Sequence, residues 1–178
     1  MMTFKSILRT IVIMQSMAIS LSSLAKNKEQ PYLRDGVSFS VPAGWKTIAN
    51  DSIGDNAYYF SAERVGKLAT GVITVAWVNK IEDPDKMIEI HQQSMKSANI
   101  YRNPGIEFSA IENEIFAALK VRSCHYITFV NEQKLEGTIY CFNSSDKTIT
   151  FFLQSGLNDH KLNQKAFELL RSTFNCRD

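Results

Sequence analysis

Residues 117–154, AALKVRSCHYITFVNEQKLEGTIYCFNSSDKTITFFLQ, decide the fold of this chain. Runs rich in Ile, Thr, Tyr, Phe and Val span residues 117–130, 135–142 and 147–154, and short polar stretches separate them at residues 131–134 and 143–146. Residues of these types at this spacing predict β-strands. Because such short connections join only neighbouring antiparallel strands, the stretch predicts a three-stranded antiparallel meander.

The first 25 residues differ in character from the rest of the chain. Lys5 and Arg9 form a basic start, residues 11–21 are mostly apolar, and the small residues Ser23 and Ala25 follow. This pattern is typical of a secretory signal peptide and predicts cleavage after Ala25, hence a periplasmic or secreted protein. The alternative, a retained membrane anchor, is weaker because so short an apolar run does not cross a bilayer comfortably.

The charge of the exported chain argues against two classes of partner. The whole chain has 20 basic and 18 acidic side chains, a formal net charge of +2. Removal of the signal peptide takes away Lys5 and Arg9 and no acid, so 18 of each sign remain and the net charge is zero. Nucleic acid and anionic membrane surfaces both require a concentrated cationic face. We therefore expect neither nucleic acid nor a membrane surface as the partner.

The remaining chain has the length and composition of one domain. Residues 26–31 form a charged leader that we expect to be flexible, and residues 32–178, in a sequence with 44% apolar residues, suffice for one core. Residues 68–79 are apolar on both alternating faces, which implies that a sheet is covered on both sides. The expected fold class is therefore α+β, with an antiparallel sheet flanked by helices.

Two helices are expected to provide this cover. Asp83 and Pro84 supply a capping side chain and a proline at the first helical position. The stripe of this helix, which runs to Ile100, is Met87, Ile88, His91, Met95 and Ala98. A second helix follows a cap at Asn158 or Asp159. Its expected buried stripe is Leu162, Ala166, Phe167, Leu169, Leu170 and Phe174.

Three cysteines remain in the exported chain, and one pair has a plausible spacing for a disulfide. If the first hairpin of the meander is symmetric about Glu132 and Gln133, Cys124 faces Cys141 directly. Directly opposed residues have the Cβ separation that a disulfide needs. Two alternatives stay open: both residues are buried thiols, or Cys176 competes for the pairing.

The sequence predicts no catalytic residue. Cys124 and His125 are adjacent, but consecutive side chains on a strand point to opposite faces, so the two cannot form a thiol–imidazole pair. The same symmetric hairpin places His125 opposite Tyr140. A hydrolase or thiol enzyme would need His125 or His91 to meet a Cys or Ser in an open cleft.

No metal site or cofactor is predicted either. His91, His125 and His160 lie on different expected elements, without the short spacing of zinc ligands. Glu112 and Glu114 fall in an expected turn, where a solvated pair of acids is the ordinary explanation.

Large aromatic side chains near loops and strand ends are candidates for contact with a partner, because such rings are frequent anchors in interfaces. The candidates are Trp45, Tyr58, Tyr59, Trp77 and Tyr101. Packing in the core explains the same residues equally well.

The order of these features resembles the PsbP-like and DcrB-like proteins. The matching motifs are GVSFSVPAGW at residues 36–45, a helix after EDPD at residues 82–85, the meander, and AFELLRSTF at residues 166–174. The resemblance covers roughly residues 32–174 and implies an α-β-α sandwich with about six to seven strands. It implies non-enzymatic roles: luminal photosystem accessory subunits, small periplasmic proteins and lipoproteins, and secretion accessory factors. The residue directly after the cleavage site is Lys26 and not the cysteine that is acylated in lipoproteins, so the chain departs from the lipoprotein members.

Together these observations predict a non-catalytic exported module that docks a protein partner in the bacterial envelope, for example in secretion or in immunity to a toxin. The alternative is a carrier of a small molecule or lipid, with a pocket between sheet and helix. A hydrolase or thiol enzyme is the weakest of the three hypotheses.

Overall fold

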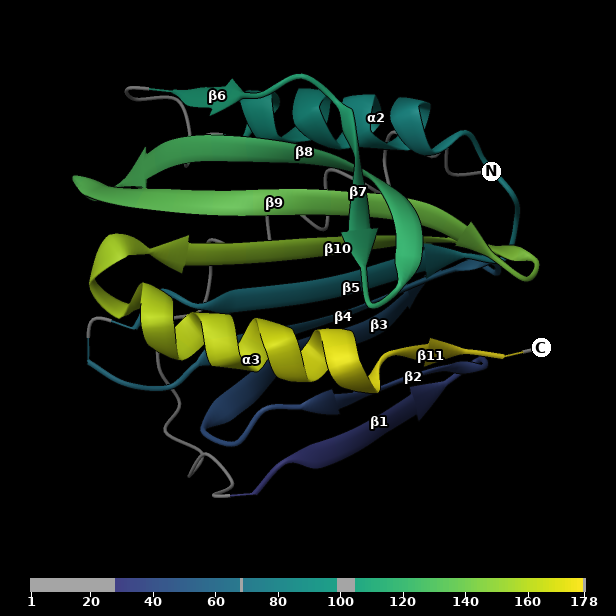
Figure 1. Ribbon diagram of the computed structural model, residues 1–178, viewed down its shortest axis with the longest axis horizontal. Helices are drawn as coiled ribbons and strands as arrows, with labels where there is room; N and C mark the ends of the chain where they lie inside the picture. Colours follow the sequence, from purple (N-terminus) through teal and green to yellow (C-terminus); the bar gives the residue numbers. More distant parts are fainter. Residues whose placement is uncertain (1–27, 68, 99–104, 178) are drawn as a thin grey trace.

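The structure, a computed structural model, describes residues 28–67, 69–98 and 105–177. Within these residues, a large antiparallel sheet has eight strands (Figure 1). They are β3 (Trp45–Ile53), β4 (Ala57–Arg64), β5 (Val72–Val78), β6 (Ile106–Phe108), β7 (Glu112–Phe116), β8 (Leu119–Val130), β9 (Gln133–Ser144) and β10 (Lys147–Gly156). Their order is β3-β4-β5-β10-β9-β8-β6, and β7 pairs with β8 beside β6. The α+β class is confirmed, with more strands than the six to seven expected.

A second, smaller sheet contains both ends of the described chain. It consists of β1 (Gln30–Arg34), β2 (Val37–Val41) and β11 (Asn175–Cys176), in the order β1-β2-β11. Asp35 and Gly36 connect β1 to β2 with φ angles of 54° and 76°, the left-handed values that a tight hairpin turn requires. Because β1 starts at Gln30, the last two residues of the predicted leader belong to the fold.

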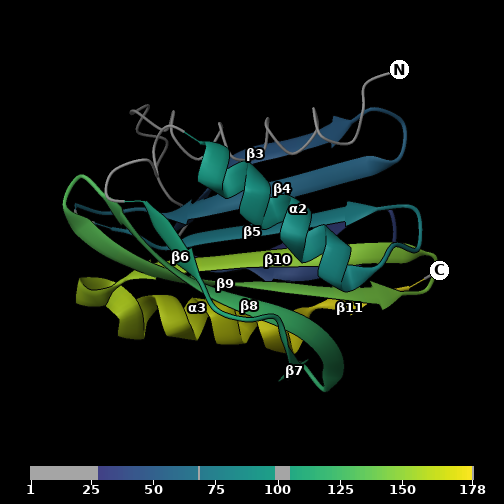
Figure 2. The same cartoon turned by 90° about the horizontal axis from the view of Figure 1, so that it is seen from above.

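Helices cover both faces of the large sheet (Figure 2). We call the face under α2 (Pro84–Ser97) the back face, and the face under α3 (His160–Thr173) the front face. The small sheet lies beside α3 on the front face. Each face has its own apolar cluster, the front one built around Phe151 and Trp77 and the back one around Ile88 and Ile139. The predicted sandwich of helices around a sheet is therefore confirmed.

Both helices begin where the sequence predicts, but their details differ. Asp83 caps α2, its carboxylate accepting a hydrogen bond from the Asp85 amide at 3.0 Å. A short 3₁₀ turn, η2 (Leu157–Asp159), precedes α3, and Asp159 makes no side-chain capping bond to this helix. Leu162, expected to be buried, is 58% exposed, and Asn163 is fully buried in its place. Neither helix in the described ranges combines the length and apolar character that a membrane crossing requires.

The meander is confirmed, but its first turn is shorter than expected. Asn131 and Glu132 alone form the turn, with φ angles of 49° and 65°, so Val130 pairs with Gln133. This two-residue turn moves the partner of every β8 residue two positions back along β9.

The shorter turn corrects the two pairings derived from a symmetric four-residue turn. Cys124 lies opposite Ile139, and Cys141 lies opposite Arg122, so the two cysteines do not face each other. All three cysteines are free thiols. His125 lies opposite Thr138 rather than Tyr140.

The segment expected to turn at residues 112–114 is instead β7, which pairs along β8 from Glu112 opposite Ser123 to Phe116 opposite Leu119. The turn comes later, at Ala117 and Ala118, whose φ angles are 50° and 66°. Phe116 is fully buried in the front cluster, where it stacks on Phe151 at 4.7 Å between ring centroids. Burial of this ring accounts for a hairpin turn that two alanines would not favour.

Candidate functional site

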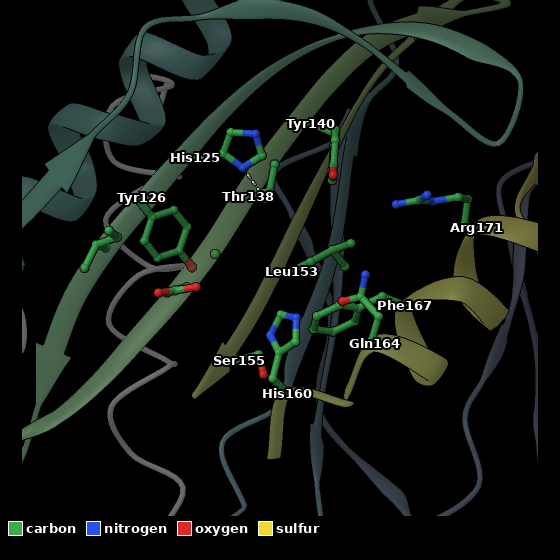
Figure 3. A pocket seen from close by; sticks show the side chains of 13 residues that line it. His125, Tyr126, Thr138, Tyr140, Leu153, Ser155, His160, Gln164, Phe167 and Arg171 are labelled. Carbon is green, nitrogen blue, oxygen red and sulfur yellow. Dashed lines mark hydrogen bonds between the residues drawn. The ribbon is translucent and has the colours of Figure 1, made fainter. Parts of the chain in front are cut away.

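A groove of about 410 Å³ lies on the front face between the sheet and α3 (Figure 3). Strands β8, β9 and β10 form its floor and one side, and α3 forms the other side. Its lining residues are His125, Tyr126, Ile127, Glu136, Gly137, Thr138, Tyr140, Leu153, Ser155, His160, Gln164, Phe167 and Arg171. A pocket between sheet and helix belonged to the alternative hypothesis of a small-molecule or lipid carrier.

Two periodicities bring these side chains together. On α3, residues 160, 164, 167 and 171 recur at the three- and four-residue spacing of one helix face. Across the sheet, His125, Thr138 and Leu153 form one row, because Thr138 pairs with His125 on one side and with Leu153 on the other. The row of sheet residues could be identified only once the strand register was known.

The base and the rim of the groove differ in polarity. Leu153 on β10 and Phe167 on α3 are buried and make the base apolar. His160 and Gln164 are exposed along the helix. The Arg171 guanidinium lies over the Phe116 ring at 5.2 Å, and its Nε has no hydrogen-bond partner among the described residues. The groove therefore combines an apolar base with hydrogen-bonding groups along its rim.

Tyr140 links this groove to a neighbouring cluster of charged side chains. Burial raises the pKa of its phenol, and the negative charge of Glu114 raises it further, whereas Arg171 opposes the shift. Tyr140 is therefore a neutral hydroxyl at physiological pH, and its side chain is hydrogen-bonded to Glu114 of the neighbouring cluster.

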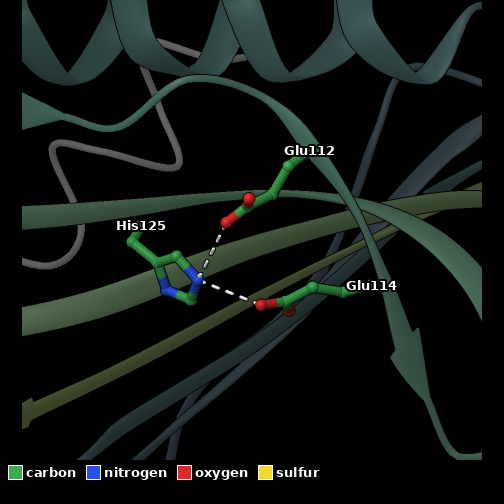
Figure 4. A group of neighbouring side chains, drawn as sticks. All are labelled: Glu112, Glu114 and His125. Atoms are coloured by element: carbon green, nitrogen blue, oxygen red, sulfur yellow. Dashed lines mark hydrogen bonds and ion pairs between the residues drawn. The ribbon is translucent and has the colours of Figure 1, made fainter.

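The cluster beside the groove consists of His125, Glu112 and Glu114 (Figure 4). Nε2 of His125 lies 3.0 Å from Oε1 of Glu114 and 3.8 Å from Oε1 of Glu112. The other ring nitrogen, Nδ1, lies 2.9 Å from the Thr138 hydroxyl. Thr138 and Glu114 together hold the imidazole at the groove rim.

Sequence reasoning missed this cluster. Glu112 and Glu114 were expected in a turn, but on β7 their alternate spacing places both on one side of a strand. That spacing was the available signal, and assigning the segment to a strand would have revealed it.

The residues considered for nucleophilic chemistry do not converge. Cys124 is buried on the back face, where its Sγ accepts a hydrogen bond from the Gln92 amide at 3.0 Å, and His125 points to the front. Burial raises the pKa of Cys141 to about 12, so this thiol stays protonated. His91 is buried on α2 against Phe152, at 4.6 Å between ring centroids.

Most of the aromatic side chains proposed as partner contacts pack inside the protein. Trp45, Tyr59 and Trp77 are 3%, 2% and 1% exposed, which removes them from the surface that a partner could touch. Tyr58 is half-buried, stacked on Trp77 and under the Arg34 guanidinium. Tyr101 lies outside the described residues.

The fold of this chain is similar to the folds of several solved structures. The chain is similar to the cyanobacterial PsbP (CyanoP) of Synechocystis sp. PCC 6803, with a TM-score of 0.57 and 14% identity over 90% of this chain and 99% of that one. It is similar to LpqN of Mycobacterium tuberculosis, a protein involved in cell envelope biogenesis, with a TM-score of 0.51 and 11% identity over 84% of this chain and 91% of that one.

A protein of Bacteroides thetaiotaomicron matches with a TM-score of 0.52 and 7% identity, over 85% of this chain and 49% of that one. No protein-family model matches the sequence, and no curated protein matches it either. These TM-scores indicate a shared fold. At identities this low, no site residue can be transferred from one protein to another. The layered sheet, its two covering helices and these similarities together show that the chain has the fold of the PsbP-like proteins.

Proposed function

We propose that this chain is exported to the bacterial envelope through a signal peptide at residues 1–25 and acts there as a non-catalytic accessory module. The front groove is the surface on which it holds a segment of a partner protein. The observation that carries the proposal is the groove itself, an apolar floor with a hydrogen-bonding rim between two rigid elements.

The openness of the rim favours a protein segment over a small molecule. His160 and Gln164 are exposed, the His125 side chain is 46% exposed, and Ile127 is 38% exposed. Small-molecule sites bury roughly 70–90% of their ligand, so a lining this exposed favours a longer occupant. A polypeptide crossing the groove would cover these side chains and still extend beyond both ends.

Proteins that share this fold support a location in the cell envelope. One of them, LpqN, is involved in cell envelope biogenesis in its own organism. The neutral exported chain and the pattern of residues 1–25 point to the same compartment.

Blocking the groove tests this proposal. Gln164→Trp places a large ring in the groove from the exposed side of α3, and we expect it to abolish recovery of a stoichiometric partner from a mild envelope extract. The matched control is Ser172→Trp, which puts the same ring on the solvent side of the same helix and leaves recovery unchanged. Equal recovery with both variants, or none with the wild-type protein, would refute the proposal.

A carrier of a small molecule is the second candidate, because the groove lies between sheet and helix as such a carrier requires. Its volume of about 410 Å³ falls within the range of about 300–1,000 Å³ found for ligand sites. Native mass spectrometry of protein purified from its own envelope distinguishes the two. A bound small mass that Gln164→Trp removes would favour the carrier.

A further inference from the structure

We propose that Glu112, Glu114 and His125 form a binding site for one divalent transition-metal ion, with zinc as the reference ion. The three residues lie at the rim of the groove, whatever molecule occupies it.

The donor set suits such an ion. Two carboxylates and a neutral imidazole offer three ligand atoms and two negative charges, which balance a divalent cation. Imidazole nitrogen favours zinc, cobalt, nickel and copper over calcium and magnesium, which prefer oxygen ligands. The donor set therefore selects a transition metal.

The spacing of the donors fits a single ion. All three ligand atoms lie within 4.8 Å of one another, and Nε2 of His125 stands 3.0 Å and 3.8 Å from the two carboxylate oxygens. Ligands bonded to one zinc ion at about 2.1 Å stand roughly 3.0–3.4 Å apart. Small rotations of the Glu112 side chain, which is 58% exposed, bring the third atom to that spacing.

The second nitrogen of His125 is already held in the way that metal-binding histidines require. Nδ1 lies 2.9 Å from the Thr138 hydroxyl, so Nδ1–H can donate to that oxygen and leave the lone pair of Nε2 directed at the two glutamates. Such an outer partner fixes the tautomer and orientation of a ligating imidazole. Thr138 is therefore a positioning residue for this site.

The location of the site gives the ion a role in binding the occupant of the groove. His125 lines the groove, and three protein ligands leave one position of a tetrahedral zinc ion open. A carboxylate or imidazole of whatever occupies the groove can take that position. The ion would then add a directional bond to a surface that otherwise offers hydrogen bonds and apolar contact.

Cobalt titration tests the proposal. The protein is expressed from the full-length gene, purified without a histidine tag, treated with chelator and titrated with Co²⁺ near neutral pH. We expect one equivalent to give the visible absorption of a nitrogen- and oxygen-ligated ion, and one equivalent of Zn²⁺ to remove it. Ca²⁺ in excess should leave the spectrum unchanged, and displacement by Ca²⁺ would contradict the assignment to a transition metal.

Variants locate the site. His125→Ala should abolish binding, and Glu114→Gln and Thr138→Val should each weaken it by roughly tenfold or more. His160→Ala, which removes another groove histidine outside the cluster, is the matched control and should bind as the wild type does. Thermal melts establish that each variant is folded. A wild-type protein that binds no Co²⁺, as expected if His125 is simply an ion-pair partner of Glu114, would overturn the proposal. So would a His125→Ala protein that binds as well as His160→Ala.

Discussion

His91 is an ionisable side chain in an apolar environment, and this sets how the protein responds to acid. Its ring is 2% exposed and lies edge-on to Phe152, and its Nε2 has no hydrogen-bond partner in the described chain. Burial lowers the pKa of His91 to about 3. The folded protein therefore keeps this imidazole neutral at any pH above that value.

This burial predicts an acid-dependent loss of stability. An unfolded histidine has a pKa near 6.5, so the unfolded state gains a proton below that pH while the folded state gains it only near pH 3. The contribution of His91 is therefore intact above pH 6.5 and declines from there down to about pH 3.

The experiment is urea unfolding at pH 7.5 and 4.5. We expect the wild-type protein to lose about 2–3 kcal/mol more between these two values than His91→Leu does, because the variant has no proton to bind. His160→Leu, at an exposed helix position, should lose as much as the wild type. Identical losses in wild type and His91→Leu would contradict the burial argument.

The burial of some residues was predicted correctly and that of others was not, for a physical reason. His91, Met87 and Met95 were assigned to one helix face, and all three are buried, because helical spacing alone determines that face. Leu162 was misplaced because the sequence does not show that Asn163 satisfies its side chain inside the protein, through Arg64 and Ser155. Buried polar networks depend on partners distant in sequence, and hydrophobic patterning does not reveal them.

At the scale of elements, a network of polar side chains attaches the start of α3 to the sheet. The Asp159 carboxylate accepts hydrogen bonds from the Thr70 amide at 2.9 Å, from the Thr70 hydroxyl and from the Arg64 guanidinium. Burial works to raise the pKa of Asp159, but the hydrogen bonds from Thr70 and Arg64 outweigh it and lower the pKa. The sequence predicted Asp159 only as a possible helix cap.

Removing this charge should destabilise the whole fold. Asp159→Asn leaves the partly buried Arg64 without its counter-ion, and we expect a loss of about 3 kcal/mol in the free energy of unfolding. Asp146→Asn is the control, because Asp146 is 70% exposed and solvent screens its pair with Lys147, so a much smaller loss is expected. Chemical denaturation measures both, and equal small losses would show that the network does not hold α3.

The strands of the meander were predicted well, but their pairing was not, because the length of one turn decides the register. The strands of the meander follow from composition, but a turn of two residues instead of four moved every partner of β8 by two positions. The same difficulty hid β7, since the turn at Ala117 and Ala118 has none of the residues that mark tight turns.

For the whole molecule, the layered architecture could be predicted because apolar residues on both faces of β5 require cover on both sides. Ile73, Val75 and Trp77 belong to the front cluster, which α3 and the small sheet cover together, and Ala76 and Thr74 are buried on the opposite face. The groove could not be predicted, because it exists only where a row of sheet residues meets one face of α3. That meeting depends on strand register and on helix position together.

The central claim is that the front groove is the binding surface of an exported module, and site-specific photo-crosslinking in the cell tests it most directly. A benzophenone amino acid at position 164 faces the groove, and the same residue at position 172 faces solvent from the same helix. We predict a discrete covalent adduct with one envelope protein from position 164 and none from position 172. The same adduct from both positions, or an adduct from position 172 alone, would contradict the claim.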